Sequence, residues 1–316
     1  MACLPILAEP LPAFDAEEAY TVSGVSSGAY MAVQFHVAHS ALVKGAGAIA
    51  GGPYYCAQGS IWAAYYNCRT PGWLAPLPSF AALEAQTERL AQSGGIDAVG
   101  NLGSSRAWLF TGTADRTVTR DVVEALHAFY RRHGANTVMV RDKPAGHAMV
   151  TEAAGNECGT TGTPYINDCD YDAAGELLKH LLGELQPGAR QGGRLLQFDQ
   201  KPFGSHSISM ADVGYVFVPK SCEAVRCRVH VAFHGCRQNA DEVGERFVRE
   251  AGYNRWAEAN RLIVLYPQTI KRYWGIYNPR GCWDWWGYTG AQYHTKDGAQ
   301  VRAVKAMLDR LSARRR

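Results

Sequence analysis

The sequence predicts an α/β fold with a mostly parallel central sheet and helices on both faces. Short apolar runs alternate with longer helix-like segments along most of the chain, which is typical of parallel strands joined by crossover helices. A Gly-x-Ser-x-Gly pattern at 24–28 lies between such a strand and such a helix. The 316 residues, 47% hydrophobic and 19% charged, can bury one large core. We expect a single domain over 1–316, because no repeat or low-complexity linker leads to a separate substrate-binding domain.

The first element pair is a strand at 19–23 followed by a helix that opens at 29–35. Between them lies Ser26, flanked by Gly24 and Gly28. A serine on a tight strand-to-helix turn needs small neighbours, because side chains there would clash. An ordinary Gly/Ser turn is the alternative, since a chance match is a real risk in a chain with 33 glycines. The flanking elements favour a nucleophile elbow.

Two further strands are expected at 45–50 and 107–112, and the second leads to Asp115. A helix over 118–132, a strand over 137–141 and a short loop then lead to His147. Asp115 or His147 alone could be a solvated turn or loop residue. Serine, then an acid after one strand, then histidine after the next is the chain order of an α/β-hydrolase triad. The joint order favours a triad of Ser26, Asp115 and His147.

The C-terminal half contains the strands that usually precede an elbow. We expect strands at 195–198, 213–218, 228–233 and 262–266, and helices at 245–260 and 296–311. The third strand leads into His234-Gly235-Cys236, a placement similar to the oxyanion loop of esterases. The interpretation is a circularly permuted α/β-hydrolase fold. In it, about 195–311 supplies the usual N-terminal strands, and 19–186 supplies the elbow, the acid and the histidine.

Five segments carry a more specific resemblance over about 11–311. They are VSGVSSGAYMA at 22–32, GGPYYCA at 51–57, FHGC at 233–236, LYPQ at 265–268 and GCWDW at 281–285. These segments resemble those of the single-domain, circularly permuted poly(3-hydroxybutyrate) depolymerases. The resemblance implies a serine esterase that hydrolyses poly(3-hydroxybutyrate), related short-chain polyhydroxyalkanoates and their oligomers through an acyl-enzyme.

The resemblance also implies a role for each site residue. Ser26 would be the nucleophile, His147 the base and Asp115 the acid that orients it. The backbone N–H groups of Ser27 and Cys236 would form the oxyanion hole, and Trp283 would contact substrate. No metal or other cofactor is expected.

The substrate is less closely defined by the residues themselves. Aromatic residues crowd the segment around Trp283, and they suit an apolar groove. For Trp285 and Trp286 we favour a structural role in bracing the loop. A feruloyl or acetyl esterase would also suit such a groove, and a polymer-binding protein without catalysis is a further, less favoured hypothesis. The resemblance favours the polyester.

Eight of the nine cysteines can be paired, which leaves Cys3. Spacing and the resemblance favour Cys56–Cys68, Cys158–Cys169, Cys222–Cys227 and Cys236–Cys282. A zinc site is the competing hypothesis, although its spacing fits no standard module; it would use Cys222, Cys227, His234 and Cys236. Disulfides indicate an extracellular or periplasmic protein. Residues 1–7 show no signal peptide, so an intracellular location is the alternative.

Charge and hydropathy limit the partners. The net charge is +3, and the one basic cluster is at 314–316, so nucleic acid is not expected as a partner. No apolar run has transmembrane length, so we expect no membrane partner. The expected partner is a polyester or its oligomers, and the expected state is a monomer.

Overall fold

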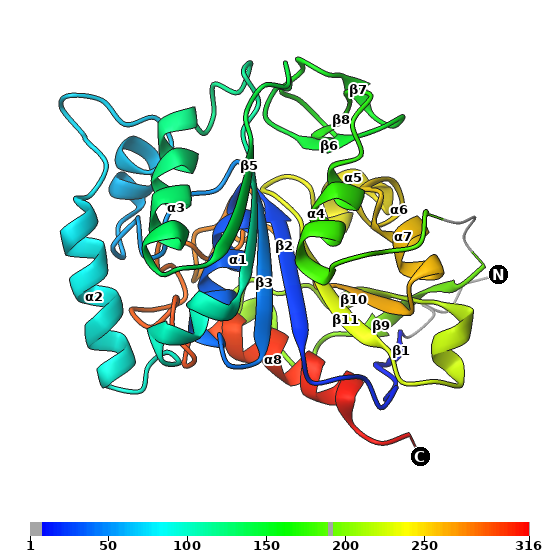
Figure 1. Ribbon diagram of the computed structural model, residues 1–316. Coiled ribbons are helices and arrows are strands. Elements are labelled where there is room, and N and C mark those ends of the chain that lie inside the picture. The colour runs from blue at the N-terminus through cyan, green and yellow to red at the C-terminus, as the bar shows by residue number, and fades with distance from the viewer. Residues whose placement is uncertain (1–7, 189–191, 316) are drawn as a thin grey trace.

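A nine-stranded sheet forms the centre of the computed structural model, which describes residues 8–188 and 192–315 (Figure 1). Its spatial order is β1-β9-β10-β12-β11-β2-β3-β4-β5. From β12 to β5 all neighbours are parallel, whereas β10 runs antiparallel to β9 and β12. The strands are β1 (Glu9–Pro10), β2 (Tyr20–Val25), β3 (Val43–Ile49), β4 (Arg106–Phe110), β5 (Asn136–Val140), β9 (Arg194–Asp199), β10 (Val213–Val218), β11 (Arg228–Phe233) and β12 (Leu262–Tyr266).

A small parallel sheet of order β6-β8-β7 follows β5, and helices cover both faces of the large sheet. The small strands are β6 (Met149–Thr151), β7 (Asn156–Glu157) and β8 (Ile166–Asp168). The helices are α1 (Ser27–Ala38), α2 (Phe80–Gln92), α3 (Arg120–Arg132), α4 (Ala173–Leu182), α5 (Ala240–Val243), α6 (Arg246–Glu250), α7 (Tyr253–Ala259) and α8 (Ala299–Ser312). Short helical turns are Ala63–Asn67, Val99–Ser104, His206–Ile208 and Lys220–Glu223.

The sheet order agrees with the permuted arrangement expected from the sequence. Strand β11, from the C-terminal half, pairs in parallel with the elbow strand β2, and Phe233 lies opposite Gly24. The expected strands at 195–198, 213–218, 228–233 and 262–266 are β9, β10, β11 and β12, and all four lie on one side of β2. The α/β fold class is confirmed, and residues far apart in the chain meet at the centre of the sheet.

Two apolar cores lie on the two faces of the sheet. One contains side chains of α1, α3 and α8, including Phe35, Leu126 and Leu308, and the other contains side chains of α4, α6 and α7, including Leu177 and Phe247. Figure 1 shows α3 and α4 on opposite sides of the sheet. Strand β12 is buried along its whole length, as continuous apolar strands of parallel sheets are. Within the described ranges, no helix is long and apolar enough to cross a membrane.

The expected helix over 245–260 is wrong, because it is two helices. Helix α6 ends at Glu250, and Gly252 has φ 93° before α7 begins at Tyr253. Glycine readily adopts a positive φ, which interrupts helical geometry. The apolar periodicity of the sequence continues across this break and therefore did not reveal it. Helices α2 and α4 and the small sheet were not foreseen. In α2 only Leu83 and Thr87 are buried, which leaves little apolar pattern to detect.

Buried histidines make stability depend on pH. Burial lowers the pKa of His36 and His230 to about 3 and that of His234 to about 4, from an ordinary value of 6.5. Below pH 6.5 the unfolded chain therefore binds more protons than the folded protein. We expect the free energy of unfolding to fall as pH falls from 6.5 towards 4, by up to about 1.4 kcal/mol per pH unit for each histidine.

Urea unfolding at pH 7, 6 and 5 measures this slope. A His230→Gln variant isolates one histidine, because its slope should be smaller than that of the wild type whatever its absolute stability. Equal slopes in the two proteins would contradict the assignment of a depressed pKa to His230.

Candidate active site

Ser26 lies on a strained turn between β2 and α1, and close backbone packing explains both flanking glycines. Its φ is 57° and its ψ is −123°, a conformation rare for residues with side chains. A Cβ on Gly24 would lie 2.2 Å from the carbonyl oxygen of Gly28, and one on Gly28 would lie 2.3 Å from that of Phe233. The Ser26 N–H donates to the Ile49 oxygen at 2.9 Å. The local geometry is that of a nucleophile elbow.

Asp115 and His147 form a buried pair. Nδ1–H of His147 donates to Oδ2 of Asp115 at 2.8 Å, and both residues are 6% exposed. The other carboxylate oxygen accepts from the N–H groups of Thr117 at 2.7 Å and Val118 at 3.0 Å. These bonds leave Nε2 of His147 as the nitrogen available for proton transfer.

The loops that carry this pair are tied to each other by backbone contacts. A Cβ on Gly112 would lie 2.0 Å from the Ala145 oxygen, so glycine is required there for close approach. The Ala114 N–H donates to the same oxygen at 3.2 Å, and the His147 N–H donates to Oγ1 of Thr161 at 2.9 Å. The expected order of strand, acid, strand and histidine therefore produces one connected site.

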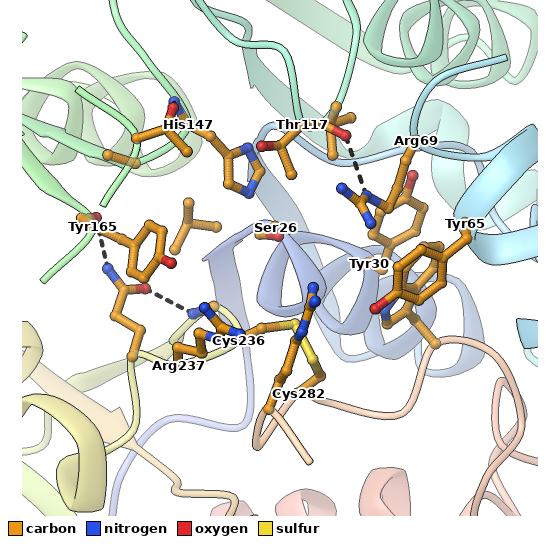
Figure 2. Close-up of a pocket in the computed structure, with 18 of the residues that line it drawn as sticks. Ser26, Tyr30, Tyr65, Arg69, Thr117, His147, Tyr165, Cys236, Arg237 and Cys282 are labelled. Atoms are coloured by element: carbon orange, nitrogen blue, oxygen red, sulfur yellow. Dashed lines mark hydrogen bonds between the residues drawn. A yellow bond between two sulfur atoms is a disulfide. The ribbon is translucent and has the colours of Figure 1, made fainter. Parts of the chain in front are cut away.

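Ser26 and His147 line the same pocket, which has a volume of about 170 Å³. Figure 2 shows the imidazole of His147 directed towards Ser26. The wall is mainly aromatic and apolar, and it includes the disulfide between Cys236 and Cys282. The aromatic lining residues are Tyr30, Tyr65, Tyr165, Trp285 and Trp286.

Cys236 lines this pocket, and Ser27, the other residue predicted to donate to the oxyanion, directly follows the pocket residue Ser26. Ser27 is the first residue of α1, where N–H groups point out of the helix. Among the described residues, neither N–H has a hydrogen-bond partner. The carbonyl oxygen of the Gly235–Cys236 peptide is held by His234. Nε2 of His234 accepts from the Thr269 N–H at 3.2 Å, so Nδ1 carries the proton and donates to the Gly235 oxygen at 2.7 Å.

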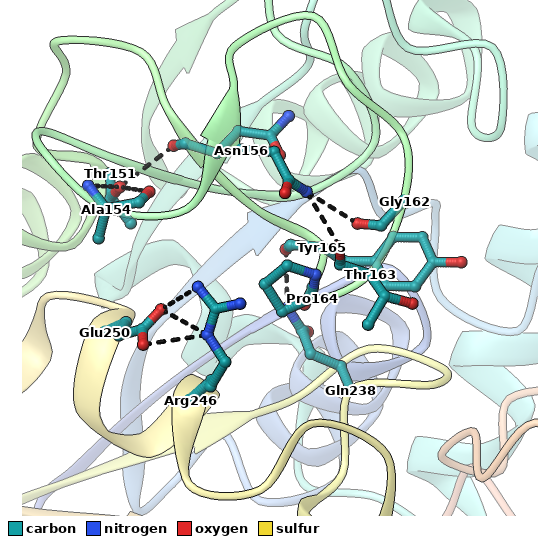
Figure 3. Close-up of polar contacts among 11 residues, drawn as sticks. Thr151, Ala154, Asn156, Gly162, Thr163, Pro164, Tyr165, Gln238, Arg246 and Glu250 are labelled. Atoms are coloured by element: carbon teal, nitrogen blue, oxygen red, sulfur yellow. Dashed lines mark hydrogen bonds and ion pairs between the residues drawn. The ribbon is translucent and has the colours of Figure 1, made fainter.

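Gln238 also holds this loop, and the sequence did not point to it. Its Oε1 accepts from the Gly235 N–H at 2.7 Å, while its Nε2 donates to the Tyr165 oxygen at 2.8 Å (Figure 2). Figure 3 shows the same side chain beside the 162–165 turn, where Nδ2 of Asn156 donates to the Gly162 oxygen at 3.1 Å. The side chain of Gln238 is buried, and both its oxygen and its nitrogen are hydrogen-bonded. It therefore links the oxyanion loop to the turn that carries Tyr165.

The structure corrects the expectation about Trp283. Trp283 was expected to contact substrate, but it is 0% exposed and packs against Phe233 at a ring-centroid distance of 4.9 Å. It does not line the pocket. Trp285 and Trp286 are only 6% and 8% exposed, which agrees with the bracing role favoured for them, and they also line the pocket. The Trp285 ring also stacks on Tyr30 at 4.1 Å.

A buried carboxylate holds this tryptophan segment in place. Oδ1 of Asp284 accepts from the N–H groups of Gly287 at 2.7 Å and Tyr288 at 3.0 Å, and Oδ2 accepts from the Thr289 N–H at 2.7 Å and its hydroxyl at 2.6 Å. Burial raises the pKa of Asp284, while these donors oppose that shift. The turn that presents Trp285 and Trp286 therefore depends on one acceptor-only group.

The disulfides are those that spacing and the resemblance favour. The structure joins Cys56–Cys68, Cys158–Cys169, Cys222–Cys227 and Cys236–Cys282. The alternative zinc site is wrong, because three of its ligands are used in two separate disulfides and both ring nitrogens of His234 are hydrogen-bonded. Across 8–188 and 192–315, no group of three or more His, Cys, Asp or Glu could hold a metal ion. Cys3 lies outside the described residues.

An elbow serine at the edge of a mostly parallel sheet, facing a histidine with its own acid, defines the class of α/β-hydrolases. A family model described as Esterase PHB depolymerase matches residues 213–315. A polyhydroxybutyrate depolymerase of Talaromyces funiculosus is 38% identical over 321 residues, covering 95% of this chain and 91% of that protein. The chain therefore belongs to the poly(3-hydroxybutyrate) depolymerase family, a family of carboxylic ester hydrolases.

Further comparisons agree with this membership. A poly(3-hydroxybutyrate) depolymerase of Delftia acidovorans is 44% identical over 315 residues, which is 96% of this chain but only 62% of the length of that relative. A PHB depolymerase from Penicillium funiculosum has a similar fold, with a TM-score of 0.87, 35% identity and coverage of 96% and 98% of the two chains. A PHB depolymerase complexed with an R3HB trimer also has a TM-score of 0.87, with 34% identity and the same coverage.

Replacing Asp284 by Asn tests the support of the pocket wall. One oxygen would become an NH₂ group facing N–H donors, so buried donors would lose their partner. We expect a loss of about 2 kcal/mol in the free energy of unfolding. Displaced tryptophans should also lower kcat/KM for p-nitrophenyl butyrate by on the order of 10-fold to 10²-fold.

Denaturant unfolding and initial rates measure both effects. Asp297→Asn is the matched control, because Asp297 is exposed, and its stability should change by less than about 0.5 kcal/mol. If Asp284→Asn behaved like that control, the pocket wall would not depend on the carboxylate.

Proposed function

We propose that this protein hydrolyses ester bonds of poly(3-hydroxybutyrate), related short-chain polyhydroxyalkanoates and their oligomers through a Ser26 acyl-enzyme. The observation that carries the proposal is the elbow serine sharing one pocket with the His147–Asp115 pair. The similar proteins are depolymerases of polyhydroxybutyrate, which supports the polyester as substrate, and the R3HB trimer bound to one of them supports binding of oligomers. All of these site residues lie in one chain, so the proposed active form is the monomer.

The geometry supports a two-step reaction. Nε2 of His147 takes the proton of Ser26 as its oxygen attacks the ester carbonyl carbon, and Asp115 stabilises the resulting imidazolium. The N–H groups of Ser27 and Cys236 hold the tetrahedral oxyanion, each worth a factor of about 10² to 10³ in rate. The ester C–O bond then breaks, and His147 protonates the departing alcohol. Water, deprotonated by His147, releases the acid and restores Ser26.

Exposed aromatic side chains near the pocket support a polymeric substrate. These side chains lie on two segments, 61–74 and 273–277. The first segment contains the pocket residues Tyr65 and Arg69, and the second ends three residues before the pocket residue Arg280. A soluble ester needs no such surface, whereas a solid polyester could adsorb to it. The exposed aromatic side chains on these segments are Trp62, Tyr66, Trp73, Tyr273, Trp274 and Tyr277.

The proposed location is an oxidising compartment outside the cytoplasm, extracellular or periplasmic. Four disulfides support it, because such bonds persist where the thiol-reducing systems of the cytosol do not act. The Cys236–Cys282 disulfide is part of the pocket wall, and the Cys56–Cys68 disulfide lies next to the wall residue Arg69. Reduction would therefore affect the site as well as stability.

Ser26→Ala tests the mechanism directly. We expect turnover of p-nitrophenyl butyrate and clearing of an amorphous poly(3-hydroxybutyrate) suspension to fall by on the order of 10⁶-fold, with folding intact. Ser104→Ala, which changes an exposed serine far from the elbow in sequence, should retain wild-type rates. Near-wild-type turnover by Ser26→Ala would contradict the assignment of Ser26 as the nucleophile. Activity of the wild type on the small ester without clearing would move the substrate to another ester.

Replacing Trp73 and Trp274 by Ala tests adsorption. They are 89% and 85% exposed, so their loss should not disturb packing. Each indole can bury about 150–250 Å² against a polymer, so we expect clearing to slow by at least about threefold. Hydrolysis of p-nitrophenyl butyrate should stay unchanged. Equal clearing rates, measured by turbidity at limiting enzyme, would exclude this surface from polymer binding.

A further inference from the structure

The pocket carries positive charge that ester hydrolysis does not require. Its lining contains Arg69, Arg237 and Arg280, and no Asp, Glu or Lys. The ion pairs that arginines make elsewhere in the described ranges involve other arginines. Arg69 is partly buried, whereas Arg237 and Arg280 are exposed, so their guanidinium groups are accessible to an anionic ligand and can bind it through charge-assisted hydrogen bonds.

The backbone holds two of these arginines in place. Arg69 directly follows Cys68, and its carbonyl oxygen accepts from the Thr119 N–H at 2.8 Å. Its Nε donates to the Thr117 oxygen at 3.2 Å, close to the acid loop. Arg280 lies two residues before Cys282, and its carbonyl oxygen accepts from the Arg237 N–H at 2.7 Å. A disulfide thus anchors the chain beside each arginine.

The same two guanidinium groups share one aromatic neighbour. The Cζ atom of Arg69 lies 4.7 Å from the centroid of the Tyr65 ring, and that of Arg280 lies 5.9 Å from it. Figure 2 shows Tyr65 and Arg69 together on one side of the pocket, with Arg237 across from them. Arg69 and Arg280 therefore share one aromatic neighbour in the lining of the pocket that also contains Ser26.

The chemistry of the substrate identifies that ligand. Every internal ester of a polyhydroxyalkanoate is neutral, and the one charged group of the chain is the carboxylate at its end. We propose that Arg69 and Arg280 form a subsite for the terminal carboxylate of a 3-hydroxyalkanoate oligomer, placing an ester near that end on Ser26. The subsite rests on the proposed function. Guanidinium and carboxylate match in charge and in planar, bidentate geometry.

The subsite also sets the direction of cleavage. In attack by Ser26, the bond from its oxygen to the acyl carbon forms and the ester C–O bond breaks. The fragment with the terminal carboxylate is the departing alcohol, and it takes its proton from His147. Short hydroxyacids are thus released from the carboxyl end, and free 3-hydroxybutyrate, which carries the same carboxylate, should compete for the subsite.

The test compares an R3HB trimer as the free acid with its methyl ester, which removes only the charge. Initial rates are measured at low ionic strength for wild type, Arg280→Gln, Arg69→Gln and the double variant, with p-nitrophenyl butyrate as a third substrate. Arg302→Gln is the matched control, because Arg302 is an exposed residue of α8 outside the pocket.

We expect the ratio of kcat/KM for acid over methyl ester to fall about fivefold to tenfold in Arg280→Gln, a modest value because this arginine is exposed. The double variant should lose more, and Arg302→Gln should keep the wild-type ratio. The p-nitrophenyl butyrate rate should stay unchanged in Arg302→Gln, which lies outside the pocket. Added salt should lower the wild-type ratio, and inhibition by 3-hydroxybutyrate should weaken in the variants.

Two results would overturn this inference alone. Equal losses on acid and methyl ester would show that the guanidinium groups bind ester carbonyls, and an unchanged ratio in the double variant would show that they do not contact the chain end. A wild-type enzyme that hydrolyses p-nitrophenyl butyrate but neither form of the trimer would overturn the proposed substrate, and the subsite with it.

Discussion

The close packing of Gly28 against β11 is the contact on which the site depends. A side chain there would meet the carbonyl oxygens of Phe233 at 2.3 Å and His234 at 2.4 Å. The start of α1 can therefore reach the oxyanion loop only because this residue has no Cβ. The same contact joins a segment near the N-terminus to one more than 200 residues later. The elbow and the 234–236 loop thus form a single packing unit, although the chain supplies them separately.

Around that unit, the pocket wall is held by hydrogen bonds to buried groups of fixed character. Neutral His234 orients the Gly235 carbonyl, Gln238 satisfies the N–H of the same residue, and Asp284 accepts the N–H groups of the tryptophan turn. Each has the donor or acceptor pattern its neighbours require, and an isosteric change of that pattern would leave a buried group unpaired. Ser26 can therefore stay in a strained conformation, because the groups around it have few alternative arrangements.

The sequence predicted the residues whose position follows from element order. Ser26, Asp115 and His147 each come after a strand that the sequence predicts, so their meeting follows from the parallel sheet. Side-chain direction within the wall could not be inferred in this way. Trp283 and Trp285 are two residues apart in one loop, yet one packs in the core and the other on the pocket, since tertiary contacts decide. The pocket arginines likewise depend on loops anchored by disulfides.

The permuted order leaves the chemistry unaffected because the site lies at one edge of the sheet. Ser26 follows β2, Asp115 follows β4, His147 follows β5 and Cys236 follows β11, and these strands are parallel. The carboxyl ends of parallel strands meet at the same edge, whichever strand comes first in the chain. Moving the termini changes which loops are covalently continuous but not which strand ends face each other. The site requires the spatial order of the strands, and next to Ser26 this order is fixed by the pairing of β2 with β11.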